Sequence, residues 1–299
     1  VRTMGGAMQS NAAIANAYVA DITEPEKRAK RFGLLGAMMG LGFIVGPVMG
    51  GLLGAIDLKL PFWVAGGLAM LNLLYGYFVL PESLPADQRK SLNWGAFNPV
   101  KAFRDLAGLK GVRALVGVVV FSGLAQFILY TSWVLYNTFK FGWGPLENGW
   151  SLAVVGVVSV IVQGVLMGRL IKRFGPQRLA VMGLISSVMA YALWGAASEG
   201  WMMYAVIAFN LLGGTVAASV QSLISSAADS KSQGQTLGAV SALNGLMAVV
   251  APLIATPLLA AVSHLPQGDW RIGAPFYFCA LLQVVSLGLA VRYFKAHRV

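Results

Sequence analysis

Long uncharged stretches alternate with short charged segments along this chain. The uncharged windows span residues 3–20, 33–56, 60–80, 114–139, 148–168, 179–198, 200–228, 232–263 and 272–291. A helix needs about 20 apolar residues to cross roughly 30 Å of hydrocarbon, and each window reaches or nearly reaches that length. The windows are uniformly apolar, whereas barrel strands alternate. The pattern therefore predicts an all-α, polytopic membrane protein with nine transmembrane helices.

The composition supports a membrane protein and excludes several other classes. The chain is 57% hydrophobic and 11% charged, with a mean hydropathy of +0.70, whereas soluble domains carry about 25% charged residues. A single cysteine, Cys279, excludes an internal disulfide. The chain has two histidines and shows no catalytic constellation. We therefore do not expect it to be an enzyme or to bind a cofactor or a metal.

The net charge of +11 has a topological explanation. Basic residues cluster at the ends of the apolar windows, as the positive-inside rule requires, so we do not expect nucleic acid as a partner. Eighteen Lys and Arg residues fall in alternate loops and the C-terminal tail, against three on the opposite side: Lys59, Lys140 and Arg271. This asymmetry predicts a cytoplasmic C-terminus and an N-terminus, as given, on the outside.

Two windows share a spacing that indicates an internal repeat. Gly33, Gly40 and Pro47 recur, with the same intervals of seven, as Gly238, Gly245 and Pro252. If these two helices are equivalent, the second half has six helices, and three are missing from the front of the first. The expected organisation is the rest of an N-terminal half at 1–80, a cytoplasmic loop at 81–112 and a C-terminal half at 113–299.

Five strings, in order along the chain, resemble the tetracycline-resistance exporter family of the major facilitator superfamily. They are YVADITEPEKRAKRFG, GLGFIVGPVMGG, KFGWGPLENGWSLAVVG, GRLIKRFGPQR and QGQTLGAVSALNGLMAVVAPL. The resemblance implies an incomplete major facilitator fold of three plus six helices, the fourth to the twelfth. It also implies a secondary transporter of a bacterial inner membrane that exchanges a small molecule for protons.

The chain departs from the family at positions that bear on the substrate. Ser159 and Ser187 stand where tetracycline exporters carry His in the eighth helix and Asp in the ninth, and Lys172 replaces an acidic residue of the loop motif. These differences argue against tetracycline itself. We expect export of drug-like amphipathic compounds by alternating access, with a metabolite carrier (for a sugar or an organic acid), a non-transporting scaffold or an inactive fragment as alternatives.

Glycines recur every four residues in window 33–56, and residues at this spacing share one helix face. Such a face lets a neighbouring helix approach closely, and a proline beside it bends the helix. The resemblance implies an antiporter motif that seals the centre of the carrier, while plain tight packing is the alternative. The residues concerned are Gly42, Gly46, Pro47, Gly50, Gly51 and Gly54.

Arg2 is the charged residue that the resemblance connects with proton coupling. It shares a helix face with Gln9 and Asn16, at intervals of seven. The alternative is that Arg2 reaches the outer membrane surface. None of the eleven acidic residues lies in the middle of an apolar window, so either the coupling carboxylates lie in the missing helices or this protein does not use protons.

Polar and aromatic residues inside the windows are candidates for a substrate cavity, as in sites for drug-sized ligands. The alternative is that these residues form interhelical hydrogen bonds that only hold the helix bundle together. The candidates are Gln9, Gln126, Tyr130, Trp133, Asn137, Gln163, Asn210, Gln221, Asn244 and Met247.

Two predicted cytoplasmic loops could act as gates. Their residues are Asp21, Arg28, Arg31, Gly168, Arg169, Arg173 and Gly175. A solvated run of charge that only sets the topology is the alternative. As partners we expect the lipid bilayer, a small-molecule substrate and protons, with the chain acting as a monomer.

Overall fold

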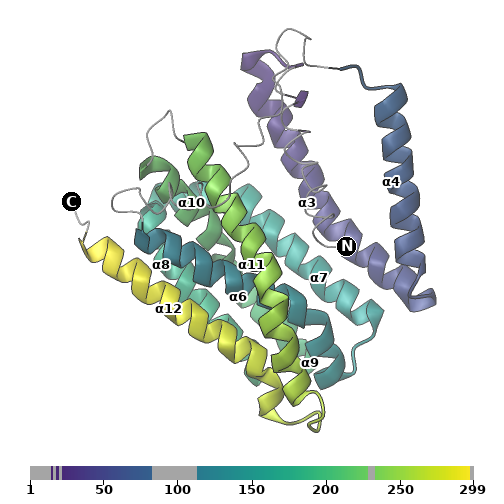
Figure 1. The fold of residues 1–299 in the computed structure, drawn as a ribbon, viewed down its shortest axis with the longest axis vertical. Coiled ribbons are helices and arrows are strands. Elements are labelled where there is room, and N and C mark those ends of the chain that lie inside the picture. Colours follow the sequence, from purple (N-terminus) through teal and green to yellow (C-terminus); the bar gives the residue numbers. More distant parts are fainter. Residues whose placement is uncertain (1–14, 16–17, 20–21, 83–112, 228–232, 297–299) are drawn as a thin grey trace. The chain divides into compact units, whose positions relative to one another are not determined.

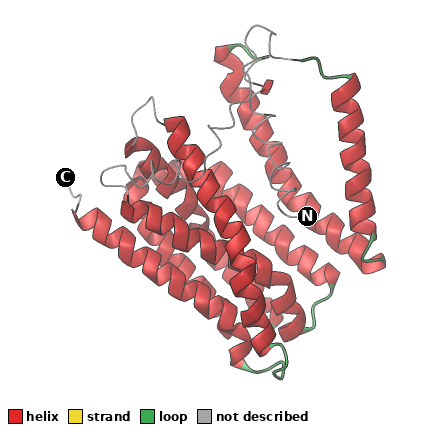
Figure 2. Ribbon diagram, viewed as in Figure 1, coloured by secondary structure: helices red, strands yellow, loops and turns green. Residues whose placement is uncertain are grey.

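The computed structural model describes residues 15, 18–19, 22–82, 113–227 and 233–296. Within these ranges the chain is helical and contains no strand (Figure 2), which confirms the all-α prediction. The α-helices are α3 (Pro25–Ile56), α4 (Leu60–Phe78), α6 (Arg113–Phe141), α7 (Pro145–Val160), α8 (Met167–Ala196), α9 (Gly200–Phe209), α10 (Val216–Ala227), α11 (Gln233–Val262) and α12 (Ala274–Ala296).

Each apolar window that the structure describes is occupied by helix. Among the described residues, six helical stretches are long and apolar enough to cross a membrane, and α3 adds the shorter apolar segment Gly40–Ile56. One stretch, Pro145–Ala196, is 52 residues long and covers two predicted windows. The window at 3–20 lies almost wholly outside the described residues. The chain is therefore a multi-pass membrane protein.

A sharp turn at Gly175 separates those two windows. Gly175 has φ +74° and ψ 160° and is followed by Pro176. A positive φ is accessible to glycine at little cost, and proline disfavours the helical conformation in the residue before it. The turn ends one membrane crossing and begins the next, as the windows 148–168 and 179–198 predict.

Two windows that predict unbroken helices are interrupted in the structure. Window 148–168 contains a π-helix, η3 (Ile161–Leu166), and window 200–228 contains a 3₁₀-helix, η4 (Asn210–Thr215). Apolar length alone carries no information about the period of the backbone hydrogen bonds. The Gly213–Gly214 pair in η4 was the one local sign of a break, because glycine weakens a helix interior.

The chain separates into two compact units. Unit 1 comprises residues 1–96 and 145–156, and unit 2 comprises 97–144 and 157–299. The expected linker at 81–112 lies outside the described residues except for its first two positions, so the predicted division into halves stays a prediction.

Unit 1 contains α3, α4 and most of α7 (Figure 1). A short turn joins α3 to α4, where the Asp57 carboxylate accepts a hydrogen bond of 2.7 Å from the Lys59 backbone N–H. None of the described side chains of α4 is buried. Apolar side chains exposed along a membrane-spanning helix are suited to lipid.

Unit 2 is a helix bundle in which α12 packs against α6 and α8, and α11 packs against α6 (Figure 1). Its interior is filled by aliphatic side chains from several helices. They include Leu115, Val118, Leu184, Val220, Ile224 and Leu243. Small side chains such as Ala180 and Ala239 are buried in the same cluster and allow the helices to approach closely.

Candidate functional site

A close helix contact in unit 1 joins α3 to α7 through glycines. A Cβ added to Gly149 would lie 2.8 Å from the Gly51 Cα and 2.8 Å from the Pro47 carbonyl oxygen. One added to Gly156, seven residues further along α7, would lie 2.7 Å from the Phe43 carbonyl oxygen. Real Cβ atoms do not approach backbone atoms this closely, so the contact requires glycine at both positions.

The face of α3 that makes this contact lies beside the predicted one. Among the described residues, no atom lies within 4 Å of a Cβ added to Gly42, Gly46 or Gly50. Of the predicted residues, Pro47, Gly51 and Gly54 lie in the seam together with Phe43, and a Cβ added to Gly54 would lie 3.2 Å from the Pro145 side chain. Successive helical residues point about 100° apart, so a shift of one position selects a different face.

The partner glycines on α7 were not singled out in the sequence. Gly149 and Gly156 are seven residues apart and therefore lie on one helix face. This interval of seven equals the interval between Gly40 and Pro47 of α3, and it was visible in the sequence. It gave no indication of which helix the face would meet, because that depends on tertiary packing.

The polar stripe predicted on α6 is divided between the interior and the surface of the helix bundle. Tyr130 is 61% exposed and Gln126 is half-buried, whereas Trp133 and Asn137 are 4% and 0% exposed. Trp133 packs edge-on against Trp194, with ring centroids 5.3 Å apart. Asn137 Oδ1 and Nδ2 have no hydrogen-bond partner among the residues that the structure describes. In this conformation Tyr130 is open to a ligand, and the two deeper residues form part of the packed interior.

The remaining cavity candidates fall into two groups. Gln163 and Gln221 are exposed. Asn210 Oδ1 accepts a 3.0 Å hydrogen bond from Ser186 Oγ, and Asn244 lies 3.3 Å from a Cβ added to Gly123 of α6. Met247 lies 3.8 Å from the same point and is buried. Asn210, Asn244 and Met247 therefore contact neighbouring helices, as the alternative interpretation of interhelical packing expects.

The two serines that depart from the family pattern differ in their surroundings. Ser159 on α7 is half-buried, whereas Ser187 on α8 is 5% exposed. The next residue back, Ser186, is the one that hydrogen-bonds to Asn210. Position 187 thus lies within the packed interior of unit 2.

The end of α8 is held by two side chains of α6 that were not predicted to act together. The Tyr136 hydroxyl donates a 2.6 Å hydrogen bond to the Trp194 carbonyl, and Lys140 Nζ donates a 3.0 Å bond to the Gly195 carbonyl. Carbonyls in the last turn of a helix have no intrahelical donor, and a cation there is favourable. Lys140 is 6% exposed and also lies 5.4 Å from the centre of the Tyr136 ring.

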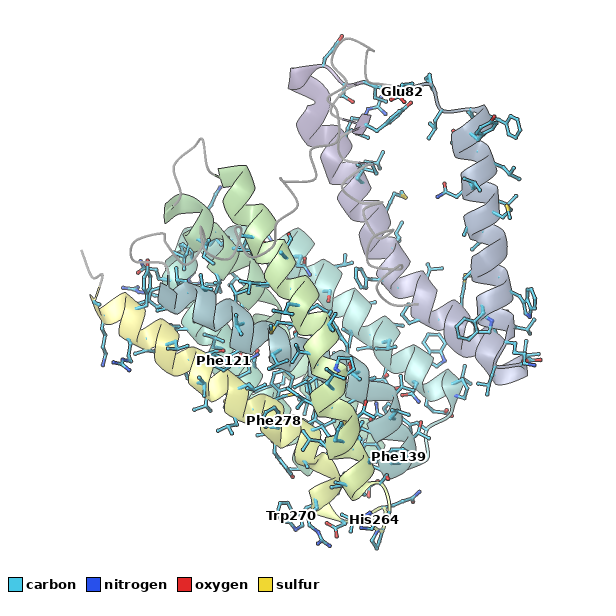
Figure 3. All side chains as sticks on the ribbon, viewed as in Figure 1. Glu82, Phe121, Phe139, His264, Trp270 and Phe278 are labelled. Carbon is cyan, nitrogen blue, oxygen red and sulfur yellow. The ribbon has the colours of Figure 1, made fainter. Side chains whose placement is uncertain are left out.

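A charged pair lies in the connection between α11 and α12, near Trp270 and His264 (Figure 3). The Asp269 carboxylate accepts hydrogen bonds from Arg271, the shortest 2.6 Å from Nη2. The side-chain and then the backbone hydrogen bonds from Arg271 lower the pKa of Asp269 to about 2, with a smaller contribution from the charge of Lys140. This carboxylate is ionised at neutral pH.

The predicted gate loops are described only in part. Arg169 and Arg173 are exposed, as is Gly168 between them and η3, and the Arg173 guanidinium lies 5.4 Å from the centre of the Phe174 ring. Arg31 is exposed near the start of α3. Arg28 lies in the same helix, without a described side chain. Arg2, Gln9 and Asp21 lie outside the described residues, so the predicted coupling role of Arg2 stays a prediction.

Comparison with known proteins identifies the family of this chain. The Major Facilitator Superfamily profile matches residues 1–252 and 115–299. The tetracycline resistance protein of class C from Escherichia coli is 37% identical over 94% of this chain and 71% of its own length. The class D protein from Salmonella ordonez is 31% identical over 92% of this chain and 70% of its own length.

Solved structures agree on the fold. The human organic anion transporter MFSD10 (TETRAN) has a TM-score of 0.67 at 23% identity and covers 97% of this chain and 70% of its own. A bacterial homolog of the human lysosomal transporter Spinster has a TM-score of 0.64 at 15% identity, covering 95% and 74%.

The helical fold and these relatives define a secondary membrane transporter. The chain belongs to the Major Facilitator Superfamily and, within it, to the tetracycline exporter family. The resemblance seen in the five sequence strings is thereby confirmed.

Proposed function

We propose that this protein exports drug-like amphipathic compounds by alternating access, in exchange for protons. The single observation that carries the proposal is the backbone contact between Gly51 of α3 and Gly149 of α7. In the predicted division at 81–112, α3 belongs to the first half and α7 to the second. A contact without side chains between the halves suits a carrier that rocks one repeat against the other while excluding leak.

The relatives support a drug-like substrate. The two relatives compared above are tetracycline resistance proteins. Ser159 and Ser187 differ from the residues expected for tetracycline itself, and the exposed Tyr130 with its neighbour Gln126 offers an amphipathic surface. We therefore favour other amphipathic compounds over tetracycline.

Exchange for protons is the second part of the proposal. It rests on the resemblance of Arg2, in the predicted first half, to the arginine that serves proton coupling in the family. We further propose a bacterial inner-membrane location with a cytoplasmic C-terminus, from the distribution of basic residues, and a carrier that works as a monomer between the lipid bilayer, its substrate and protons.

The test is dye efflux from bacterial cells that express the protein. Cells that express the native protein and are loaded with ethidium should lose it faster than cells that express the Gly149→Val variant at equal membrane abundance. The same comparison is made with tetracycline. A protonophore should abolish the difference. Equal retention with both proteins across a broad panel of dyes and antibiotics would exclude drug export. Energised uptake of a sugar or an organic acid would favour the metabolite carrier instead.

A further inference from the structure

The two interruptions of the membrane helices lie side by side in unit 2. η3 and η4 are in contact, and the Val162 side chain lies 3.6 Å from a Cβ added to Gly214. η3 begins 13 residues after the start of its apolar window at 148, and η4 begins 10 residues after the start of its window at 200. Two breaks in different helices therefore meet at a similar depth in the membrane.

Each break changes the period of the backbone hydrogen bonds. At the end of η3 the Met167 N–H donates to the Val162 carbonyl, five residues back. At the end of η4 the Val216 N–H donates to the Gly213 carbonyl, three residues back. Such transitions change which N–H each backbone carbonyl meets, the hydrogen-bond geometry of a 3₁₀ segment is poorer than that of an α-helix, and π-bulges and mid-helix 3₁₀ segments occur often at functional positions.

One side of η4 is fixed against α8. A Cβ added to Gly183 would lie 2.6 Å from the Leu212 carbonyl oxygen, and Ser186 hydrogen-bonds to Asn210. This packing holds the break in place. The opposite side is open: Gly214 is exposed, as are Gln163 and Gly164 on η3.

Irregular backbone at membrane depth is tolerated where protein buries it or where it borders water, and not where it faces lipid. Since Gln163, Gly164 and Gly214 are exposed rather than buried, they are expected to border an aqueous space. On the side of η3 that carries Ile161 and Val165, bulky apolar side chains are exposed and cover the backbone, so this side suits lipid.

We propose that η3 and η4 together form a polar subsite that binds hydrogen-bond donors of a ligand, such as amine, ammonium or hydroxyl groups. The Gln163 amide oxygen and the backbone carbonyls at the two breaks accept these hydrogen bonds. No atom lies within 4 Å of a Cβ added to Gly164, among the described residues, so the surface beside Gln163 has room for a ligand. That the ligand is the exported compound rests on the proposed function.

The first experiment measures contact with water and does not depend on transport. The native Cys279 is buried and is replaced by serine, and single cysteines are placed at Gln163 or Val165 of the full chain in membrane vesicles. A charged, membrane-impermeant thiol reagent should react at least about tenfold faster at Gln163→Cys than at Val165→Cys, because the thiolate reacts and hydrocarbon disfavours it. Both cysteines should react equally after denaturation in detergent. Equal rates in the native vesicles would overturn the proposal.

The second experiment measures binding with ethidium, whose aromatic amines are hydrogen-bond donors. Ethidium should protect Gln163→Cys from the reagent. In direct ethidium binding, Gln163→Leu should weaken the affinity about fivefold, the value of one neutral hydrogen bond. Gly164→Leu should abolish binding by filling the subsite, whereas Gly288→Leu on α12, also exposed and without a close neighbour, should not change it.

The outcomes separate the subsite from the proposed function. Protection of Gln163→Cys without any dye efflux would retain the subsite and reject export. Efflux together with an unreactive Gln163→Cys, or with no protection by ethidium or tetracycline, would reject the subsite and retain export.

Discussion

Gly51 and Gly149 bring α3 and α7 together so closely that a Cβ on Gly149 would lie 2.8 Å from the Gly51 Cα. The atoms that would be struck belong to the backbone, which cannot rotate away as a flexible side chain can. Substitutions at this contact must therefore separate the two helices.

Gly149→Val is expected to destabilise the protein by about 1–3 kcal/mol, the usual cost of overpacking, and to abolish ethidium efflux. Thermal unfolding in detergent and dye efflux at matched expression are the measurements. Gly288→Val is the control, because a Cβ there meets no described atom within 4 Å. Equal unfolding temperatures for the two variants would contradict the close contact.

Tyr136→Phe removes the hydroxyl that donates to the Trp194 carbonyl at the end of α8. The carbonyl is left without this donor in a buried position, so a loss of about 1–2 kcal/mol is expected in the free energy of unfolding. The measurement is the unfolding of purified protein in detergent. Tyr77→Phe on α4, where the side chain is 80% exposed, should change the free energy of unfolding little. A similar loss for both variants would count against the hydrogen bond from Tyr136 as a support for the end of α8.

Asp269→Asn should give a pH-dependent difference from the native protein. The pKa of Asp269 is lowered in the folded state to about 2, so its ionised form contributes stability above the unfolded pKa of about 3.9, and that contribution is lost as the pH falls through about 2. The unfolding temperatures of the two proteins should differ by a constant amount above about pH 5 and converge towards pH 2. A difference that grows on acidification would have the wrong sign.

Asn137→Leu tests whether this residue is part of the packed interior or of the substrate cavity. Asn137 is fully buried, and its side-chain oxygen and nitrogen meet no hydrogen-bond partner within the described part of the chain. Leucine has a similar shape without polar groups to desolvate, so the free energy of unfolding should stay the same or rise by about 1 kcal/mol. Ethidium binding should be unchanged. A loss of ethidium binding with retained stability would show instead that Asn137 belongs to the substrate cavity.

Much of the fold was predictable from local patterns. Windows such as 60–80 and 114–139 coincide with α4 and α6 because the length of an uncharged segment is a local property that hydrocarbon selects directly. The turn at Gly175–Pro176 was likewise marked by residue types with strong backbone preferences. The breaks η3 and η4 were missed, since an apolar composition is compatible with several hydrogen-bond periods.

The candidate site was less predictable than the fold. The sequence indicated a glycine seam on α3, and its predicted members Gly51 and Gly54 contact α7, whereas the glycines one position earlier, such as Gly50, lie on a neighbouring face. On α6 the spacing of Gln126, Tyr130, Trp133 and Asn137 placed them on one side of a helix, yet burial divides them. A spacing defines a face, and it does not say which neighbour covers each part of that face.

The sequence by itself determined the membrane location, the helical class and the family, because hydropathy and motif strings act over short segments. Only the tertiary structure decided that Gly51 meets Gly149, that Tyr136 and Lys140 hold the end of α8, and that η3 meets η4. These contacts join residues far apart in the chain, and they depend on how whole helices pack, which no local pattern specifies.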